Sequence, residues 1–400
     1  MSMKNKRVMW VLNHTTLMEW EVPTLLDMGL EVFVPKRLPE GPNSRTANVT
    51  DEYDASLSIP QADLDHLNTI NFYEDPIDER TAAIINKHFG TCISAYIFPG
   101  LYYMLQAFEG NIFMRAFGHA GEIDYEKATD TVDFSSLQQS APQLQRSRWK
   151  RWNDYLLNRV FNLAKIKNHN LIMDEMFAKR DRIFLAAAYK EIIENETEFL
   201  RSRSVYLPLA LPPSIMETEG SWKGGDERVL FVCPNIDQID YYRRIYLTFK
   251  EELGEFPYCI AGRQDLDGVE TPLTTNDPGI LGYIAREELD ELMRTCSCMF
   301  YHSQEPRHLH YHPLEAIVIG LPLIFMSGGL LESCGGADQP GLCRSFEEAR
   351  AKILRLQSGD ESFRAEVCES QKQILAPFLS QYCTDVWRQS FQPIAMGRAA

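Results

Sequence analysis

Residues 301–316 read YHSQEPRHLHYHPLEA and hold four of the nine His residues of the chain. This polar segment follows a short apolar run, 298–302, which has the length of a buried strand. It leads into an apolar run, 314–319, which reads as a helix and ends at Gly320. A strand, a polar loop and a helix in this order predict one unit of a parallel sheet, whose ligands bind beyond the carboxyl ends of the strands.

The same alternation of apolar strands and helices runs through the whole chain. Two successive series of roughly 200 residues each predict two Rossmann-like, doubly wound α/β domains, and the cleft between two such domains is the expected binding site. The predicted strands are 7–12, 30–34, 92–98, 111–117, 181–187, 205–209, 228–233, 258–261, 280–283, 298–302 and 323–326. The predicted helices are 20–28, 101–108, 188–201, 241–253, 286–295, 314–319, 345–356 and 361–378.

The section 211–228 reads as a loop, because it holds two Pro and three Gly residues. We therefore predict an N-terminal domain of residues 1–212, a linker of 213–227 and a C-terminal domain of 228–378. Residues 379–400 form a further segment that contains the last helix.

Composition excludes several classes of protein. The 400 residues include 40 Lys plus Arg and 56 Asp plus Glu, so the net charge of −16 disfavours nucleic acid as a partner. The longest apolar run, 316–326, is far shorter than the roughly 20 residues of a membrane helix. The N-terminus lacks the features of a secretory signal, and the nine scattered Cys residues favour reduced thiols in the cytoplasm. A zinc site at Cys296 and Cys298, the only close pair, is the alternative.

The His-rich loop has the chemistry of a nucleotide site. A helix start offers backbone N–H groups and partial positive charge to a phosphate, and His312 adds a donor. Glu315 could accept hydrogen bonds from ribose hydroxyls. In the alternative interpretations, Glu315 only complements the helix dipole, or alternating His308, His310 and His312 bind zinc from one face of an extended segment.

Residues 314–316, Leu-Glu-Ala, and 320–324, Gly-Leu-Pro-Leu-Ile, carry a resemblance to a known family. Together they resemble the donor-binding region of the retaining family 4 group of GT-B glycosyltransferases. That group has two Glu residues separated by seven positions, whereas nine positions separate Glu305 from Glu315 here. The resemblance covers roughly 228–389. It implies a C-terminal domain that binds a nucleotide sugar, an N-terminal domain that binds the acceptor, and a last helix that crosses back to the N-terminal domain.

Residues 310–315, His-Tyr-His-Pro-Leu-Glu, are also similar to a segment of Kdo transferases, which use CMP-Kdo. Family 4 enzymes usually hold a diphosphate with an Arg and a Lys, but the loop 234–238 contains neither. This scarcity of cations favours a monophosphate donor such as a CMP-sugar over a UDP- or GDP-sugar. Helix N-termini could instead carry the charge of a diphosphate.

Three sets of candidate site residues follow. The donor-binding set is Arg263, Gln264, Tyr283, Ser303, Glu305, His310, His312, Pro313, Leu314 and Glu315. The acceptor-side set, beside strands of the first domain, is Asn13, His14, Thr15 and Arg115. A transfer that inverts the sugar configuration needs a base to deprotonate the acceptor hydroxyl. A transfer that retains it by two displacements needs a nucleophile beneath the anomeric carbon. The catalytic candidates are His119, Glu122, Asp124 and Asp237. We expect no obligatory cofactor or metal, although Asp265-Leu266-Asp267 looks like the metal-binding motif of the other glycosyltransferase fold.

The sequence thus predicts a cytoplasmic glycosyltransferase of polysaccharide or lipopolysaccharide biosynthesis, with a bacterial surface glycan or glycolipid as acceptor. The basic, aromatic segment 146–167 could contact the inner membrane face or a lipid-linked glycan, or it could pack its Trp residues inward as an ordinary helix. A GT-B sugar-nucleotide 2-epimerase and a non-catalytic glycan-binding or assembly subunit are the alternative functions.

Overall fold

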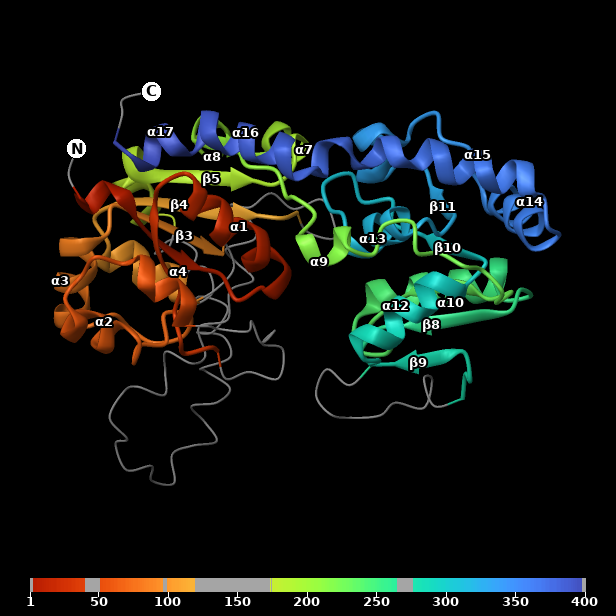
Figure 1. The fold of residues 1–400 in the computed structure, drawn as a ribbon, viewed down its shortest axis with the longest axis horizontal. Coiled ribbons are helices and arrows are strands. Elements are labelled where there is room, and N and C mark those ends of the chain that lie inside the picture. The colour runs from red at the N-terminus through yellow and green to blue at the C-terminus, as the bar shows by residue number, and fades with distance from the viewer. Residues whose placement is uncertain are drawn as a thin grey trace, which may run out of the picture. The chain divides into compact units, whose positions relative to one another are not determined.

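Two six-stranded parallel sheets organise the protein in this computed structural model (Figure 1). The structure describes residues 3–39, 51–95, 99–118, 173, 175–264 and 276–397. The chain divides into unit 1, which is Met1–Leu209 with Cys383–Ala400, and unit 2, which is Ala210–Tyr382. The predicted fold class, two doubly wound α/β halves, is confirmed.

The sheet of unit 1 has the strand order β2-β1-β3-β4-β5-β6, and all of its pairs are parallel. Its central strands are continuous apolar runs because helices cover both faces of the sheet. The strands are β1 Arg7–Val11, β2 Glu31–Phe33, β3 Thr91–Ala95, β4 Asn111–Ala116, β5 Ile183–Ala187 and β6 Ser204–Tyr206. The helices are α1 Thr15–Asp27, α2 Gln61–Leu67, α3 Glu79–His88, α4 Pro99–Ala107, α7 Lys190–Glu194, α8 Glu198–Ser202, α16 Ser380–Ser390 and α17 Gln392–Ala395.

Two helix predictions in unit 1 were wrong at their limits. Helix α1 begins at Thr15 rather than at residue 20, because the Nδ1 atom of His14 caps it by accepting from the Leu17 N–H at 3.3 Å. The predicted helix 188–201 is two short helices, since α7 ends at Glu194 and α8 begins only at Glu198. Helices α2 and α3 were not predicted.

The sheet of unit 2 has the order β12-β11-β10-β7-β8-β9 and is again parallel. Counted within the unit, this is the order 6-5-4-1-2-3 of a dinucleotide-binding fold, with its topological switch point between β7 and β10. The strands are β7 Val229–Val232, β8 Tyr258–Ala261, β9 Ile280–Gly282, β10 Cys298–Tyr301, β11 Leu323–Met326 and β12 Leu342–Cys343. The helices are α9 Pro213–Met216, α10 Asp240–Leu253, α12 Arg286–Thr295, α13 Tyr311–Ile319, α14 Phe346–Gln357 and α15 Glu361–Gln371, followed by the 3-10 turns Lys372–Phe378.

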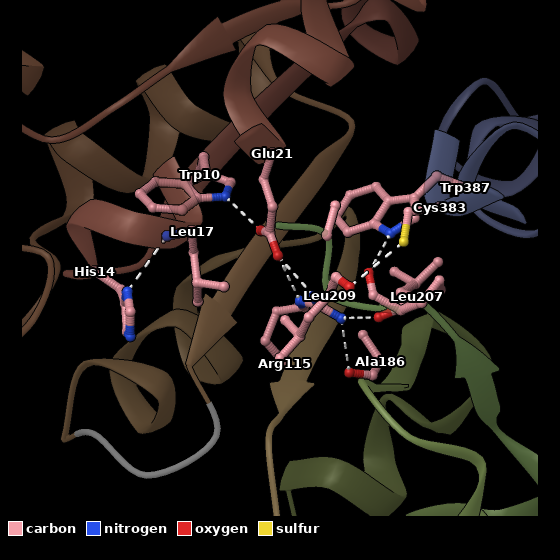
Figure 2. A network of polar contacts seen from close by, with 12 residues as sticks. Trp10, His14, Leu17, Glu21, Arg115, Ala186, Leu207, Leu209, Cys383 and Trp387 are labelled. Carbon is pink, nitrogen blue, oxygen red and sulfur yellow. Dashed lines mark hydrogen bonds and ion pairs between the residues drawn. The ribbon is translucent and has the colours of Figure 1, made fainter. Parts of the chain in front are cut away.

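A buried ion pair lies at the centre of unit 1 (Figure 2). The Arg115 guanidinium on β4 contacts Glu21 Oε1 on α1 at 2.6 Å, and each residue is only 1% exposed. The second carboxylate oxygen of Glu21 accepts from the Trp10 indole N–H at 2.9 Å. Arg115 also donates to the carbonyl oxygens of Ala186 and Leu207, so both charged groups are satisfied inside the core.

The C-terminal helices complete this core. The Trp387 ring of α16 lies 5.1 Å from the Arg115 guanidinium and packs edge-on against Trp20. Its indole N–H donates to the Pro208 carbonyl at 3.0 Å. Beyond it, Phe391 contacts Phe113 of β4. Among the described residues, no helix has both the length and the apolar character that crossing a membrane requires.

We predict that Arg115→Ala destabilises the protein by about 3–5 kcal/mol, because it leaves the Glu21 carboxylate charged and without its partner in the core. Urea denaturation followed by tryptophan fluorescence measures this. The control is Arg203→Ala, which removes an ion pair with the largely exposed Asp181 and should cost about 0.5 kcal/mol or less. Equal losses for the two variants would contradict the structural role of Arg115.

Candidate functional site

Strands β7 and β10 lie side by side in the sheet of unit 2, and a parallel sheet of this order is expected to bind its ligand at the carboxyl ends of these two strands. The chain proceeds from β7 toward β9 on one side and from β10 toward β12 on the other, so the loops after β7 and β10 diverge at this point. The two loops are 233–239 and 302–310. Most of the predicted donor-binding residues lie in these loops or beside them.

The loop after β7 has a constrained backbone. Asn235 adopts a left-handed conformation with φ of 51°, and its Oδ1 is buried without a hydrogen-bond partner. Gln264 holds the loop: its Nε2 donates to the Cys233 and Gly262 carbonyl oxygens at 2.7 and 2.9 Å, and its Oε1 accepts from the Ile236 N–H at 3.0 Å. The Gln264 amide is therefore used to position the loop rather than presented to a ligand.

Arg263, the neighbouring candidate, is exposed after β8, and its carbonyl oxygen accepts from the Asn235 N–H at 2.7 Å. Asp237, the catalytic candidate of this unit, is half-buried in the loop 233–239. Both residues therefore lie at the carboxyl edge: Asp237 is in the loop after β7, and Arg263 is in the segment after β8.

The loop after β10 is held by its own polar groups. Ser303 is buried, and its Oγ accepts from the Glu305 N–H at 3.3 Å. The Glu305 carboxylate lies near the Tyr241 hydroxyl at the start of α10. Burial, followed by the Glu305 charge, raises the pKa of Tyr241, so the hydroxyl stays protonated. This contact joins the loops on the two sides of the switch point.

The histidines gather around Tyr301. The Tyr301 hydroxyl lies 3.3 Å from His310 Nδ1, and the Nε2 atoms of His308 and His310 are 3.4 Å apart. Burial lowers the pKa of His302 to about 4 and the pKa of His312 to about 3. Both rings are therefore neutral at pH 7. Within the described ranges, no three His, Cys, Asp or Glu side chains converge as metal ligands.

Helix α13 begins at Tyr311, not at residue 314 as predicted, because Pro313 is accommodated in the first turn, where its missing N–H costs nothing. Pro313 and Leu314 are buried, and the N-cap residue His310 makes no side-chain cap. Glu315 consequently lies in the second turn and faces α12, where its Oε2 contacts Arg286 at 2.9 Å. Burial raises the pKa of Glu315, and Arg286 opposes this shift.

Tyr283, at the carboxyl end of β9, is 79% exposed and is the most exposed large apolar side chain in the described part of the chain. Its ring is available for stacking against a planar ligand. Arg286, three residues further on, is bound to Asp290 as well as to Glu315.

In unit 1, Asn13, His14 and Thr15 follow β1 at the carboxyl edge of the sheet, and His14 is occupied as the cap of α1. The assignment of Arg115 to the acceptor side does not fit the structure, because Arg115 is buried and its guanidinium is bound to Glu21 and two carbonyl oxygens. His119, Glu122, Asp124, the segment 146–167 and the Asp265-Leu266-Asp267 motif lie outside the described residues.

Sequence reasoning missed three residues at this edge: Asn235, Tyr241 and Arg286. The Pro-Asn pair after β7 was a turn signal that could have pointed to Asn235. Arg286 opens a helix that also carries Glu287 and Glu288, and its position at the start of a charged helix gives no signal of a contact with Glu315. The contact of Tyr241 with Glu305 joins residues 64 positions apart, and no sequence signal indicates it.

The contacts between Cys side chains differ from those that their spacing in the sequence suggested. The Cys296 sulfur lies 3.7 Å from that of Cys259 on β8 rather than beside Cys298. All nine thiols are free.

No family model matches the chain, and a search of curated proteins finds no match. Solved structures with the same fold do match. The Thermobaculum terrenum O-GlcNAc transferase has a TM-score of 0.53 at 12% identity, over 98% of this chain and 68% of its own. Anabaena Alr3699/HepE, in complex with UDP and glucose, has 0.53 at 11% identity, over 96% of this chain and 97% of its own. Sucrose-phosphate synthase from Thermosynechococcus elongatus has 0.51 at 11% identity, over 96% and 98%.

At these identities the similarity establishes the fold. The chain has the GT-B fold of these glycosyltransferases, as the resemblance of residues 310–324 implied. The family 4 and Kdo details stay predictions.

The ion pair between Glu315 and Arg286 gives one prediction. Glu315→Ala should lower the free energy of unfolding by about 1–3 kcal/mol, because it removes the buried one of the two carboxylates that bind Arg286 and leaves only Asp290. Glu366→Ala, an exposed Glu on α15, is the control and should stay within about 0.5 kcal/mol of the parent protein. Urea denaturation measures both. If Glu315→Ala is as mild as the control, then the contact with Arg286 is not structural.

The neutral histidines give a pH prediction. The unfolded state takes up protons on His302 and His312 below pH 6.5, whereas the folded state does not until about pH 4 or below. Stability is therefore complete above pH 6.5 and falls as the pH drops, by up to about 3 kcal/mol for His302 at pH 4. His302→Asn should flatten the stability profile between pH 6.5 and 4. A ring that titrates near pH 6.5 by NMR in the folded protein would disprove the shift.

Proposed function

We propose that the protein is a glycosyltransferase that moves a sugar from a nucleotide-sugar donor bound to unit 2. One observation carries the proposal. At the switch point of a dinucleotide-type sheet, a left-handed Asn235 holds a buried, unpartnered Oδ1 beside the His-rich loop. A buried polar atom without a partner is unfavourable in the free protein and is expected where a ligand completes the hydrogen bonding. The GT-B fold supports the same assignment.

In this proposal the base of the nucleotide stacks on Tyr283, and the phosphate lies at the start of α13. The N-terminal amides and the helix dipole of α13 supply positive charge there, with Arg263 as the nearest candidate cation. Glu315 contributes indirectly: its carboxylate holds Arg286 at the start of α12, three residues after Tyr283. The ribose contact that the sequence suggested for Glu315 is thereby replaced by a positioning role.

Two donor classes fit these residues. The loop 234–238 lacks an Arg or Lys, which favours a single phosphate and hence a CMP-sugar such as CMP-Kdo. The complex of Anabaena Alr3699/HepE with UDP and glucose supports a UDP-sugar. We take the charge of the site as the stronger argument and propose the monophosphate donor.

The acceptor and the base complete the proposal. Asp237, in the loop after β7, is the catalytic candidate of unit 2, and His119, Glu122 and Asp124 are the candidates from unit 1. We propose a bacterial surface glycan or glycolipid as acceptor, bound by unit 1 through Asn13 and Thr15. Contact of the segment 146–167 with a membrane surface or a lipid-linked glycan belongs to the same proposal, as does a cytoplasmic location.

The first test is a thermal-shift panel of CMP, UDP, GDP and ADP. We expect CMP to stabilise the protein most, because stabilisation grows with ligand concentration relative to its dissociation constant. A larger shift with UDP would replace the donor class but keep the transferase. If none of the four nucleotides stabilises the protein, then the result favours the alternative function of a non-catalytic glycan-binding or assembly subunit. Release of a free sugar isomer without any acceptor would identify the 2-epimerase.

The second test is Tyr283→Ala. Loss of a base–aromatic stack should weaken the binding of the best nucleotide of the panel by about 1–3 kcal/mol, which is about 5-fold to 150-fold. Leu354→Ala, a 52% exposed residue on α14, is the matched control and should leave the affinity unchanged. Isothermal titration calorimetry measures both variants. Equal affinity of Tyr283→Ala and the parent protein would remove Tyr283 from the site.

A further inference from the structure

A second cavity lies in unit 2 between α10, α14 and the end of β10. Its volume is about 170 Å³. Helix α10 connects β7 to β8, and helix α13 connects β10 to β11. These two connections run toward opposite ends of the sheet. Because crossovers between parallel strands are right-handed, α10 and α13 lie on opposite faces of the sheet. The cavity is lined by Arg244, Ile245, Thr248, Phe249, Phe300, His302, Gln304 and Phe346, none of which is a predicted donor-binding residue.

Three phenylalanine rings form the inner wall of this cavity. Phe300 of β10 lies at the centre, 6.1 Å from the ring of Phe249 on α10 and 6.1 Å from the ring of Phe346 on α14. The rings are tilted by 33° and 46° to one another, as in favourable aromatic contacts. An apolar cavity of about 150 Å³ in another protein accommodates benzene, so this cavity has room for one substituted aromatic ring.

Polar groups lie at the two sides of the aromatic wall. Arg244 is exposed, and its guanidinium forms no ion pair with any described residue. Thr248, one turn further along α10, presents a hydroxyl on the same side of the helix. His302 contributes an imidazole whose Nε2 has no hydrogen-bond partner. The Gln304 side chain is fixed by donation to the Ser327 carbonyl at 2.9 Å.

These groups match one kind of molecule. An Arg guanidinium recognises a carboxylate through paired N–H donors, the phenylalanine rings accept a planar apolar body, and an unpartnered imidazole nitrogen recognises a hydroxyl. We propose that this cavity is a binding site for a small aromatic carboxylate that also carries a hydroxyl group. The carboxylate pairs with Arg244, the ring lies against Phe300, and the hydroxyl bonds to His302. The cavity shares the 302–310 loop with the proposed donor site, through His302 and Gln304, but no residue of the donor-binding set lines it, and the proposal does not depend on the identity of the donor.

The test is isothermal titration of the full chain with 4-hydroxybenzoate. We expect saturable binding at one site, and a loss of about tenfold or more in Arg244→Gln, because a charge-assisted hydrogen bond is removed. Arg243→Gln is the matched control: Arg243 is the neighbouring exposed Arg of the same helix but does not line the cavity. It should bind as the parent protein does. Phe346→Leu, which keeps volume but removes a ring, should also weaken binding.

Two further probes separate the two halves of the recognition. 4-Hydroxybenzyl alcohol lacks the carboxylate and 4-hydroxycyclohexanecarboxylate lacks only the aromatic ring, and each should bind about tenfold more weakly than 4-hydroxybenzoate or worse. The proposal is overturned if 4-hydroxybenzoate does not saturate, if Arg243→Gln loses as much affinity as Arg244→Gln, or if the alcohol binds as tightly as the acid. An unchanged melting temperature of Arg244→Gln establishes that its loss of binding is not a loss of fold.

Discussion

Unit 1 depends on the buried ion pair between Arg115 and Glu21. A charge inside a protein core is tolerated only when its partner and its hydrogen bonds are complete, and this pair meets that condition with contacts from β1, α1, β4, β5 and the segment after β6. Trp387 of α16 stacks on the same guanidinium. A single charged residue therefore fixes the chain directly after β6, the first turns of α1 and the docking of the C-terminal helices. The residues at the start of α1, including the candidate Thr15, inherit their position from it.

Unit 2 fixes its loops mainly with neutral hydrogen bonds. Gln264 holds the β7 loop, the Ser303 hydroxyl accepts from the Glu305 N–H, and Tyr301 lies at the centre of the histidine cluster. Neutral groups lose less hydration on burial than charged groups do, so these hydrogen bonds hold the loops at a small desolvation cost. A loop that is already held in place loses little conformational freedom when a ligand binds.

Most strands could be predicted from the sequence to within one or two residues, because strands buried on both faces are unbroken apolar runs. The strand predicted as 205–209 ends three residues earlier, at Tyr206, and the short strand β12 was not predicted. The ends of the helices were harder to predict from the sequence. Pro313 signalled a break although it lies inside the first turn of α13. The roles of polar side chains were the hardest to predict, because they depend on partners that are distant in the sequence. Glu21 lies 94 positions from Arg115, and Arg286 lies 29 positions from Glu315. The sequence alone did not distinguish a paired internal charge from a charge presented to a ligand, although the loops that surround the switch point were identified correctly.

The distribution of cations bears on what the two faces of unit 2 can bind. Arg286 is neutralised by Glu315 and Asp290, and the buried His302 and His312 carry no charge at neutral pH because their pKa values are about 4 and 3. The cations that lie in the switch-point loops or directly after β8 are Arg307 and Arg263, so in the proposal an anion is met by backbone dipoles together with these two residues. Arg243 and Arg244 lie instead on α10, on the far face from α13. In a chain with a net charge of −16, an unpaired Arg beside an aromatic wall is a local attraction for an organic anion against an unfavourable overall field. The two faces of the same sheet are thus suited to anions of different size and charge.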